Sequence, residues 1–171
     1  MRKVVFILVC VGLTTLLATA QDVNKKVADP GAGIDILQGP CTREGLEKDV
    51  DAAWYSVGYK EYKVNEEVLA TISDDMLNGI KVNIVLGTWC PDSQREVPRF
   101  FKIMDTLGVP ESDISMICVD THKMAPSTQV DTLNIERVPT FIIYRDGKEL
   151  GRIVESPEKS LEEDLRNILL Y

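Results

Sequence analysis

Lys81-Val82-Asn83-Ile84-Val85-Leu86-Gly87-Thr88-Trp89-Cys90-Pro91-Asp92-Ser93 is the stretch from which the fold of this chain can be inferred. Its first half, residues 82–86, is a short apolar run rich in branched residues, which is typical of a buried strand. Its second half leads into a helix, because Pro91 suits the first helical position, where a missing N–H costs nothing. Cys90 is therefore expected where a buried strand meets a helix.

The expected position of Cys90 suits a nucleophile. Backbone N–H groups at a helix start point outward and carry partial positive charge, which stabilises a thiolate there. The alternative is a buried cysteine that only packs. Trp89 before it and the polar residues after it favour an exposed, reactive thiol instead.

The segments around this stretch predict an α/β fold with a mixed sheet. Apolar residues at helical spacing predict helices before it, and Asp146-Gly147 predicts a hairpin near the end. The expected helices cover residues 42–59, 65–76, a segment after 91 with a kink or restart at Pro98, 130–135 and 157–170. The expected strands cover residues 82–86, 114–119, 141–144 and 149–154. The solvent-facing side of the last helix is expected to carry Glu155, Glu158, Glu162, Glu163 and Asp164.

The first residues resemble an export signal. Arg2 and Lys3 precede an apolar run, and Ala18-Thr19-Ala20 has the small-x-small form of a cleavage site. We expect a signal peptide over residues 1–20 and an exported protein, periplasmic or extracellular, without stable membrane insertion after cleavage. A retained N-terminal anchor is the alternative. Residues 21–41 are expected to form a flexible lead-in with a brief extended piece at Ile34–Leu37, and residues 42–171 the domain.

Composition excludes several classes of function. The net charge is −8, and loss of the signal removes two positive charges and no acid, leaving −10. Such a surface disfavours nucleic acid and anionic membranes. Of four cysteines, Cys10 lies in the signal, and the odd remainder indicates a free or transiently paired thiol. One histidine and no Cys-x-x-Cys pair leave little for a zinc site, and no cofactor is expected.

Three motifs, taken in order, resemble the thioredoxin superfamily over about residues 80–170. They are Trp89-Cys90-x-x-Ser93, Val138-Pro139-Thr140 and Asp146-Gly147-Lys148 with Gly151. The resemblance implies a thioredoxin fold, with a central mixed sheet flanked by helices and a helical N-terminal extension. It also implies a cis Val138–Pro139 bond beside the active cysteine, whereas only about one X–Pro bond in twenty is cis. By resemblance, the substrate-binding residues are Trp89, Pro91, Val138, Pro139 and Thr140. The segment Arg95-Glu96-Val97-Pro98 is similar to exported Bacteroidetes-type members.

Departures from the family pattern limit the reactions that Cys90 can carry out. Ser93 replaces the second cysteine, so it can donate a hydrogen bond to Cys90 but cannot resolve a mixed disulfide. Ile84 replaces the usual buried acid. We assign Cys90, Ser93 and Asp92 to the catalytic site, although Asp92 is interpreted as complementing the helix dipole more readily than as a proton relay.

A second thiol must then release Cys90, and it can be external or internal. The internal candidates are Cys41 and Cys118. Cys118 lies in an expected strand and should be core. Cys41 precedes an expected helix and is interpreted as a surface cysteine without a role.

Two functions of different class follow. The first is a thiol-disulfide oxidoreductase or isomerase that acts on exported proteins or low-molecular-weight thiol disulfides, with an unknown redox partner. The alternative is a non-catalytic module that binds extended peptides. Iron–sulfur binding with glutathione, as in monothiol glutaredoxins, is a weaker third, because those proteins carry Cys-Gly-Phe-Ser.

Overall fold

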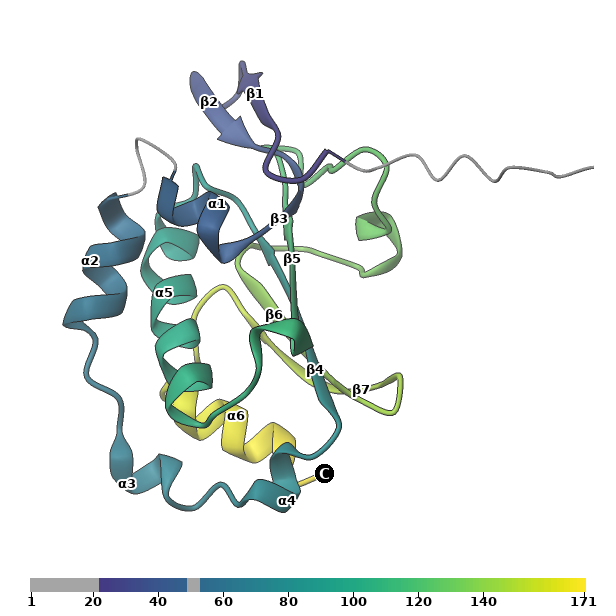
Figure 1. Ribbon diagram of the computed structural model, residues 1–171. Helices are drawn as coiled ribbons and strands as arrows, with labels where there is room; N and C mark the ends of the chain where they lie inside the picture. Colours follow the sequence, from purple (N-terminus) through teal and green to yellow (C-terminus); the bar gives the residue numbers. More distant parts are fainter. Residues whose placement is uncertain (1–21, 49–52) are drawn as a thin grey trace, which may run out of the picture.

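The computed structural model describes residues 22–48 and 53–171 (Figure 1). The expected signal peptide lies outside these residues. Within them, every helix is too short or too polar to cross a membrane.

Strands and helices follow one another in an α/β order that confirms the expected fold class. Strands β1 (Lys26–Asp29), β2 (Ile34–Leu37) and β3 (Gly39–Cys41) precede the helices α1 (Arg43–Lys48), α2 (Ala53–Glu61), α3 (Glu66–Leu69) and α4 (Asp74–Leu77). Next come β4 (Ile80–Leu86), α5 (Pro91–Thr106), the 3-10 turn η1 (Glu111–Asp113), β5 (Ile114–Cys118) and the 3-10 turn η2 (Val130–Thr132). The chain ends with β6 (Thr140–Arg145), β7 (Lys148–Val154) and α6 (Leu161–Leu169).

The main sheet is mixed, as expected, with the strand order β3-β5-β4-β6-β7. Strand β4 lies in its centre, parallel to β5 and antiparallel to β6. Ile84 faces Met116 on one side and Phe141 on the other. This central strand therefore carries the chain to Cys90 from the interior of the molecule.

Helices α1, α2, α5 and α6 gather on one side of the sheet in Figure 1, where they enclose the larger core. Phe100 of α5 stacks on Phe141 of β6, with ring centroids 4.3 Å apart. A smaller apolar cluster, which includes Val85, Val119 and Val138, lies on the other face beneath the β5–β6 loop. Cys90 belongs to this second cluster.

The expected flexible lead-in over residues 21–41 is wrong, except for the brief extended piece expected at Ile34–Leu37, which is strand β2. Strands β1 and β2 form a hairpin, and β3 adds to the main sheet by pairing with β5. Ile36, Leu37 and Cys41 are buried, and the burial of these apolar side chains holds the segment in place. A glycine that suggested flexibility instead makes the turn between β1 and β2, at Gly33, whose φ is +70°.

The helices expected over 65–76, 130–135 and 157–170 are shorter than their apolar patterns indicated, and the second of them is only the 3-10 turn η2. The structure replaces the helix expected over 65–76 with α3 and α4, separated at Thr71, whose hydroxyl donates to the Val68 carbonyl at 2.6 Å. Such side-chain bonds give the backbone an alternative to the helix. The last helix begins at Leu161 because the Ser160 hydroxyl caps it, accepting from Glu163 N at 3.1 Å.

Helix α5 runs through Pro98 in one piece, so the alternative of a restart there is wrong. Helix α2 crosses it at Gly58: a Cβ at this glycine would lie 2.8 Å from Pro98 Cγ. The missing side chain lets the two helices approach closely.

One acid of the last helix is buried instead of solvent-facing. Glu162, interpreted from the sequence as part of a wet acidic face, is 1% exposed. Its carboxylate accepts from Tyr62 Oη at 2.9 Å and from Asn65 N at 3.0 Å. Burial and this carboxylate raise the pKa of Tyr62. Glu162 therefore fastens the segment after α2 to α6.

Candidate active site

Cys90 is the residue directly before α5, as its sequence context predicts, and Pro91 occupies the first helical position. Its N–H donates to the Gly87 carbonyl at 2.9 Å, and its own carbonyl accepts from Gln94 N at 3.0 Å. The turn from β4 thus delivers the cysteine to the helix start in a defined position.

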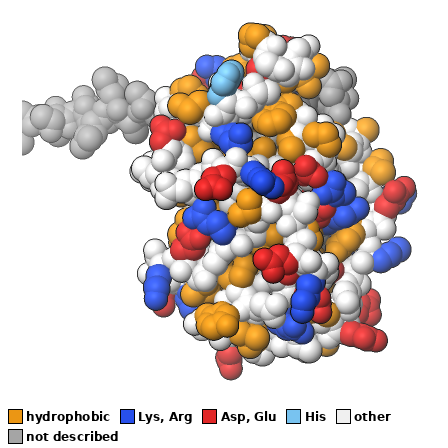
Figure 2. Space-filling view, turned by 180° about the vertical axis from the view of Figure 1, so that it is seen from behind, with side chains coloured by type: hydrophobic (Ala, Val, Ile, Leu, Met, Phe, Trp, Pro, Cys, Tyr) orange, Lys and Arg blue, Asp and Glu red, His pale blue; other side chains and the backbone are white. Residues whose placement is uncertain are grey.

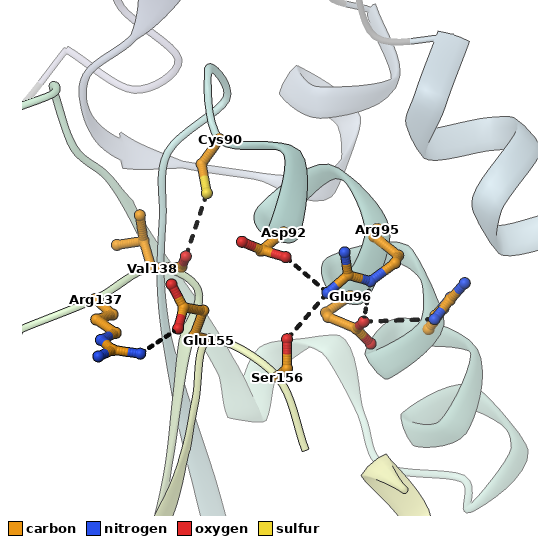
Figure 3. Close-up of polar contacts among 9 residues, drawn as sticks. Cys90, Asp92, Arg95, Glu96, Arg137, Val138, Glu155 and Ser156 are labelled. Atoms are coloured by element: carbon orange, nitrogen blue, oxygen red, sulfur yellow. Dashed lines mark hydrogen bonds and ion pairs between the residues drawn. The ribbon is translucent and has the colours of Figure 1, made fainter. Parts of the chain in front are cut away.

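The thiol is not exposed, which corrects the sequence-based expectation. Cys90 is 7% exposed, and its Sγ lies 3.3 Å from the Val138 carbonyl oxygen, to which the S–H donates (Figure 3). The Val138–Pro139 peptide is cis, as the resemblance implied. The loop that carries this peptide covers the sulfur, which local sequence around Cys90 could not reveal. The side chain of Cys90 makes no capping hydrogen bond to the helix.

The residues before Cys90 are fixed from two sides. Trp89 is half-buried, and its indole N–H donates to the Val119 carbonyl at 2.9 Å. The Thr88 hydroxyl accepts from Leu37 N at 3.2 Å, a bond inside the protein. The N-terminal hairpin therefore supports the cysteine loop, a role that sequence analysis missed because it treated residues 21–41 as separate from the domain.

Ser93 is fully buried, and its hydroxyl accepts from Gly87 N at 3.2 Å. The hydroxyl oxygen thus holds the backbone of the turn, and the structure shows no donation from this hydroxyl to Cys90. Ile84, at the position of the missing acid, is also fully buried. The space beneath the motif is occupied by a structural hydroxyl and an alkyl side chain.

Asp92 is engaged by an arginine one turn along α5. Its Oδ1 lies 2.7 Å from Arg95 Nη2, and Arg95 also pairs with the buried Glu96. These two carboxylates, Glu96 foremost, raise the pKa of Arg95, so it remains charged. The pair supports the view of Asp92 as a carboxylate that complements the helix start, because a relay needs a carboxylate available to the sulfur.

A hydrogen bond and an ion pair hold the residues around the cis peptide. Pro139 and Thr140 are buried, whereas Pro91 is exposed. The Thr140 hydroxyl donates to the Arg137 carbonyl at 2.7 Å. Arg137 Nη1 pairs with Glu155 Oε2 at 2.6 Å, on the rim of the site (Figure 3). Sequence analysis missed Arg137 and Glu155, which lie far apart along the chain.

Cys41 is buried, which corrects its assignment as a surface cysteine, and Cys118 is core as expected. Both belong to the larger core beneath the helices, whereas Cys90 belongs to the cluster on the opposite face of the sheet. None of the three is in a disulfide. The sheet therefore separates Cys90 from both internal candidates for a resolving thiol.

Charges around the molecule are mixed. On the face shown in Figure 2, Lys and Arg side chains alternate with Asp and Glu side chains instead of gathering into a basic patch. Among residues 22–48 and 53–171, no three His, Cys, Asp or Glu side chains come together as metal ligands would.

Comparison with known proteins assigns the chain to a family. The family model described as thioredoxin matches residues 46–165. The chain belongs to the thioredoxin family. It is 32% identical over 100 residues to thioredoxin Y2 of Arabidopsis thaliana, covering 56% of this chain and 57% of that protein. It is 27% identical over 82 residues to thioredoxin H2-1 of Oryza sativa, covering 48% and 55%.

This member of the thioredoxin family thus spans just over half the length of these two relatives. A solved structure of a Pseudomonas aeruginosa protein of unknown function is also similar, with 12% identity and a TM-score of 0.47, over 73% of this chain and 86% of that one.

Proposed function

We propose that the protein carries out thiol-disulfide exchange with Cys90 as its single nucleophile and an external thiol as the resolving group. The observation that carries the proposal is the place of Cys90, before α5 and 3.3 Å from the carbonyl that precedes the cis proline. Membership of the thioredoxin family supports the same chemistry.

The exchange would proceed in three steps. The Cys90 thiolate attacks one sulfur of a substrate disulfide, forms a mixed disulfide, and expels the other sulfur as a thiolate. An external thiolate then attacks the Cys90 sulfur and releases the reduced substrate. The second step leaves a mixed disulfide between Cys90 and the external thiol. A second external thiolate attacks the external sulfur of this bond, which frees the Cys90 thiolate and forms the external disulfide. The substrate gains two electrons, which the two external thiols lose.

The distribution of cysteines supports an external thiol. Ser93 supplies no second sulfur in the motif, and Cys41 and Cys118 lie beyond the sheet from Cys90. The substrates we propose are exported proteins or low-molecular-weight disulfides, met in the periplasm or outside the cell. Support for export is the composition of residues 1–20, and the segment Arg95-Glu96-Val97-Pro98 supports a Bacteroidetes-type group.

One observation favours the alternative of a non-catalytic peptide-binding module. Cys90 is 7% exposed, and its thiol donates a hydrogen bond to the Val138 carbonyl. A disulfide substrate must therefore displace the covering loop before it can reach the sulfur.

Reduction of a peptide–glutathione mixed disulfide, with glutathione as the external thiol, tests the proposal. Wild type should turn over, and Cys90→Ser should not. Cys41→Ala is the matched control, since it removes a buried thiol beyond the sheet and should keep the wild-type rate. Equal rates for wild type and Cys90→Ser, with peptide binding retained, would establish the binding module instead.

A further inference from the structure

We infer that Arg95 is a positioning residue that holds the loop of residues 137–139 over Cys90, acting through Ser156. Arg95 touches neither the sulfur nor the loop. Its contacts join the helix that begins after Cys90 to the segment that follows β7 (Figure 3).

The guanidinium of Arg95 reaches in two directions. It is held on α5 by Asp92 and by Glu96, whose side chain is 4% exposed. From there Nη2 donates to Ser156 Oγ at 3.0 Å. Two carboxylates of the same helix hold the Arg95 guanidinium in place on α5. Its hydrogen bond to Ser156 therefore fixes the segment after β7 relative to α5.

Glu155, the neighbour of Ser156, contacts the loop of residues 137–139 on both sides of the cis peptide. Glu155 N donates to the Pro139 carbonyl at 2.7 Å, and the Glu155 carboxylate pairs with Arg137 at 2.6 Å. Glu155 adopts a φ of +64°, a left-handed conformation that costs a non-glycine residue energy and persists where surrounding contacts hold it. The contact of Arg95 with Ser156 is one of those contacts.

These contacts complete a closed path. It runs from Cys90 along α5 to Arg95, across to Ser156, back through Glu155 to the 137–139 loop, and from Val138 to the Cys90 sulfur. An exposed ion pair contributes little to global stability, and the side chain of Arg95 is 41% exposed. The contact should therefore act on how often the loop leaves Cys90, with little effect on unfolding.

The rate of Cys90 alkylation by iodoacetamide measures this opening in the full chain, because the sulfur is buried at rest. Arg95→Met and Ser156→Ala should each raise the rate about two- to tenfold, the effect of one lost hydrogen bond on an opening equilibrium. Ser156→Thr keeps the hydroxyl and should restore the wild-type rate. Arg99→Met is the matched control, since Arg99 pairs with the same Glu96 one turn along α5.

Two outcomes would overturn the inference. One is an unchanged alkylation rate in Ser156→Ala, a small surface change that needs no refolding of the core. The other is an equal rise in Arg99→Met, which would assign the effect to Glu96. Urea unfolding should be the same in wild type and Ser156→Ala.

The inference rests on the proposed function only where turnover is measured. There, Ser156→Ala should raise kcat/KM for the mixed disulfide, because the loop uncovers the Cys90 sulfur more often. If wild type shows no turnover, the proposed function fails, and alkylation still decides the role of Arg95.

Discussion

Ser93→Cys should convert this protein into a dithiol reductase. The change places a second sulfur in the first turn of α5, three residues after Cys90, where it can attack a mixed disulfide on Cys90 from within the molecule. Intramolecular attack has a far higher effective concentration than an added thiol, so insulin reduction should rise by about tenfold or more. The oxidised form of the variant should contain a disulfide between Cys90 and the introduced thiol.

The structure gives the accompanying cost in stability. The Ser93 hydroxyl is fully buried and accepts a hydrogen bond from Gly87 N at 3.2 Å. Sulfur is a weaker acceptor and is larger, so the reduced variant loses about 1 kcal/mol of hydrogen bonding and about 1 kcal/mol to crowding. A disulfide that closes so short a loop returns about 2 kcal/mol by restricting the unfolded chain. The oxidised variant should therefore approach wild-type stability.

Urea unfolding with and without reductant, together with insulin turbidity, checks both expectations. Ser93→Ala is the control, because it removes the same acceptor without adding a thiol. It should share the hydrogen-bonding part of the loss of stability, and its rate of turnover is the baseline against which the gain from the second thiol is measured. The reasoning is refuted if Ser93→Cys forms its disulfide and still reduces insulin no faster than Ser93→Ala.

Three further substitutions test the packing described above. Glu162→Ala should lower the free energy of unfolding by about 1–3 kcal/mol, measured in urea, because it leaves the half-buried Tyr62 hydroxyl and the N–H of Asn65 without their acceptor; a loss under about 0.5 kcal/mol would contradict this. The N–H of Thr121, together with two N–H groups of a turn, holds the pKa of Asp29 below its usual 3.8. The ionised carboxylate therefore stabilises the fold at pH values above 3.8. This stabilisation is lost as the pH falls through the lowered pKa. The stability difference between wild type and Asp29→Asn should thus shrink between about pH 7 and pH values below the lowered pKa, and a constant difference would refute the assignment. Gly58→Ala should lower the free energy of unfolding by about 1 kcal/mol, since crowding against the α5 proline ring outweighs the helix propensity gained, and calorimetry showing a higher Tm would contradict it.

Local patterns in the sequence were sufficient for the centre of the fold. The apolar run ending at Leu86, Pro91 at the helix start and the Asp146-Gly147 turn each depend on neighbouring residues, so strand, helix and hairpin lie where expected. The cis bond at Pro139 was available from family resemblance alone, since nothing local distinguishes that proline.

The errors have a common physical cause, which is contact between distant parts of the chain. Cys90 seemed exposed because its neighbours are polar, yet a loop some fifty residues away covers it. Glu162 seemed solvent-facing until the segment after α2 supplied donors for it. Arg95 carried one usable signal, its spacing of three residues from Asp92 on a helix, but Ser156 could not be anticipated.

The position of β3 bears on how the domain can be shortened. A protein begun at residue 42, where sequence patterns placed the domain boundary, would lack Gly39–Cys41, and β5 would lose its antiparallel neighbour. The N–H and C=O groups of β5 that now face β3 would then line an open edge, beside apolar residues such as Met116. Open edges of this kind pair with other chains and promote aggregation. The three residues of β3 therefore replace the edge of β5 with a shorter edge strand, and short edge strands pair less readily with another molecule.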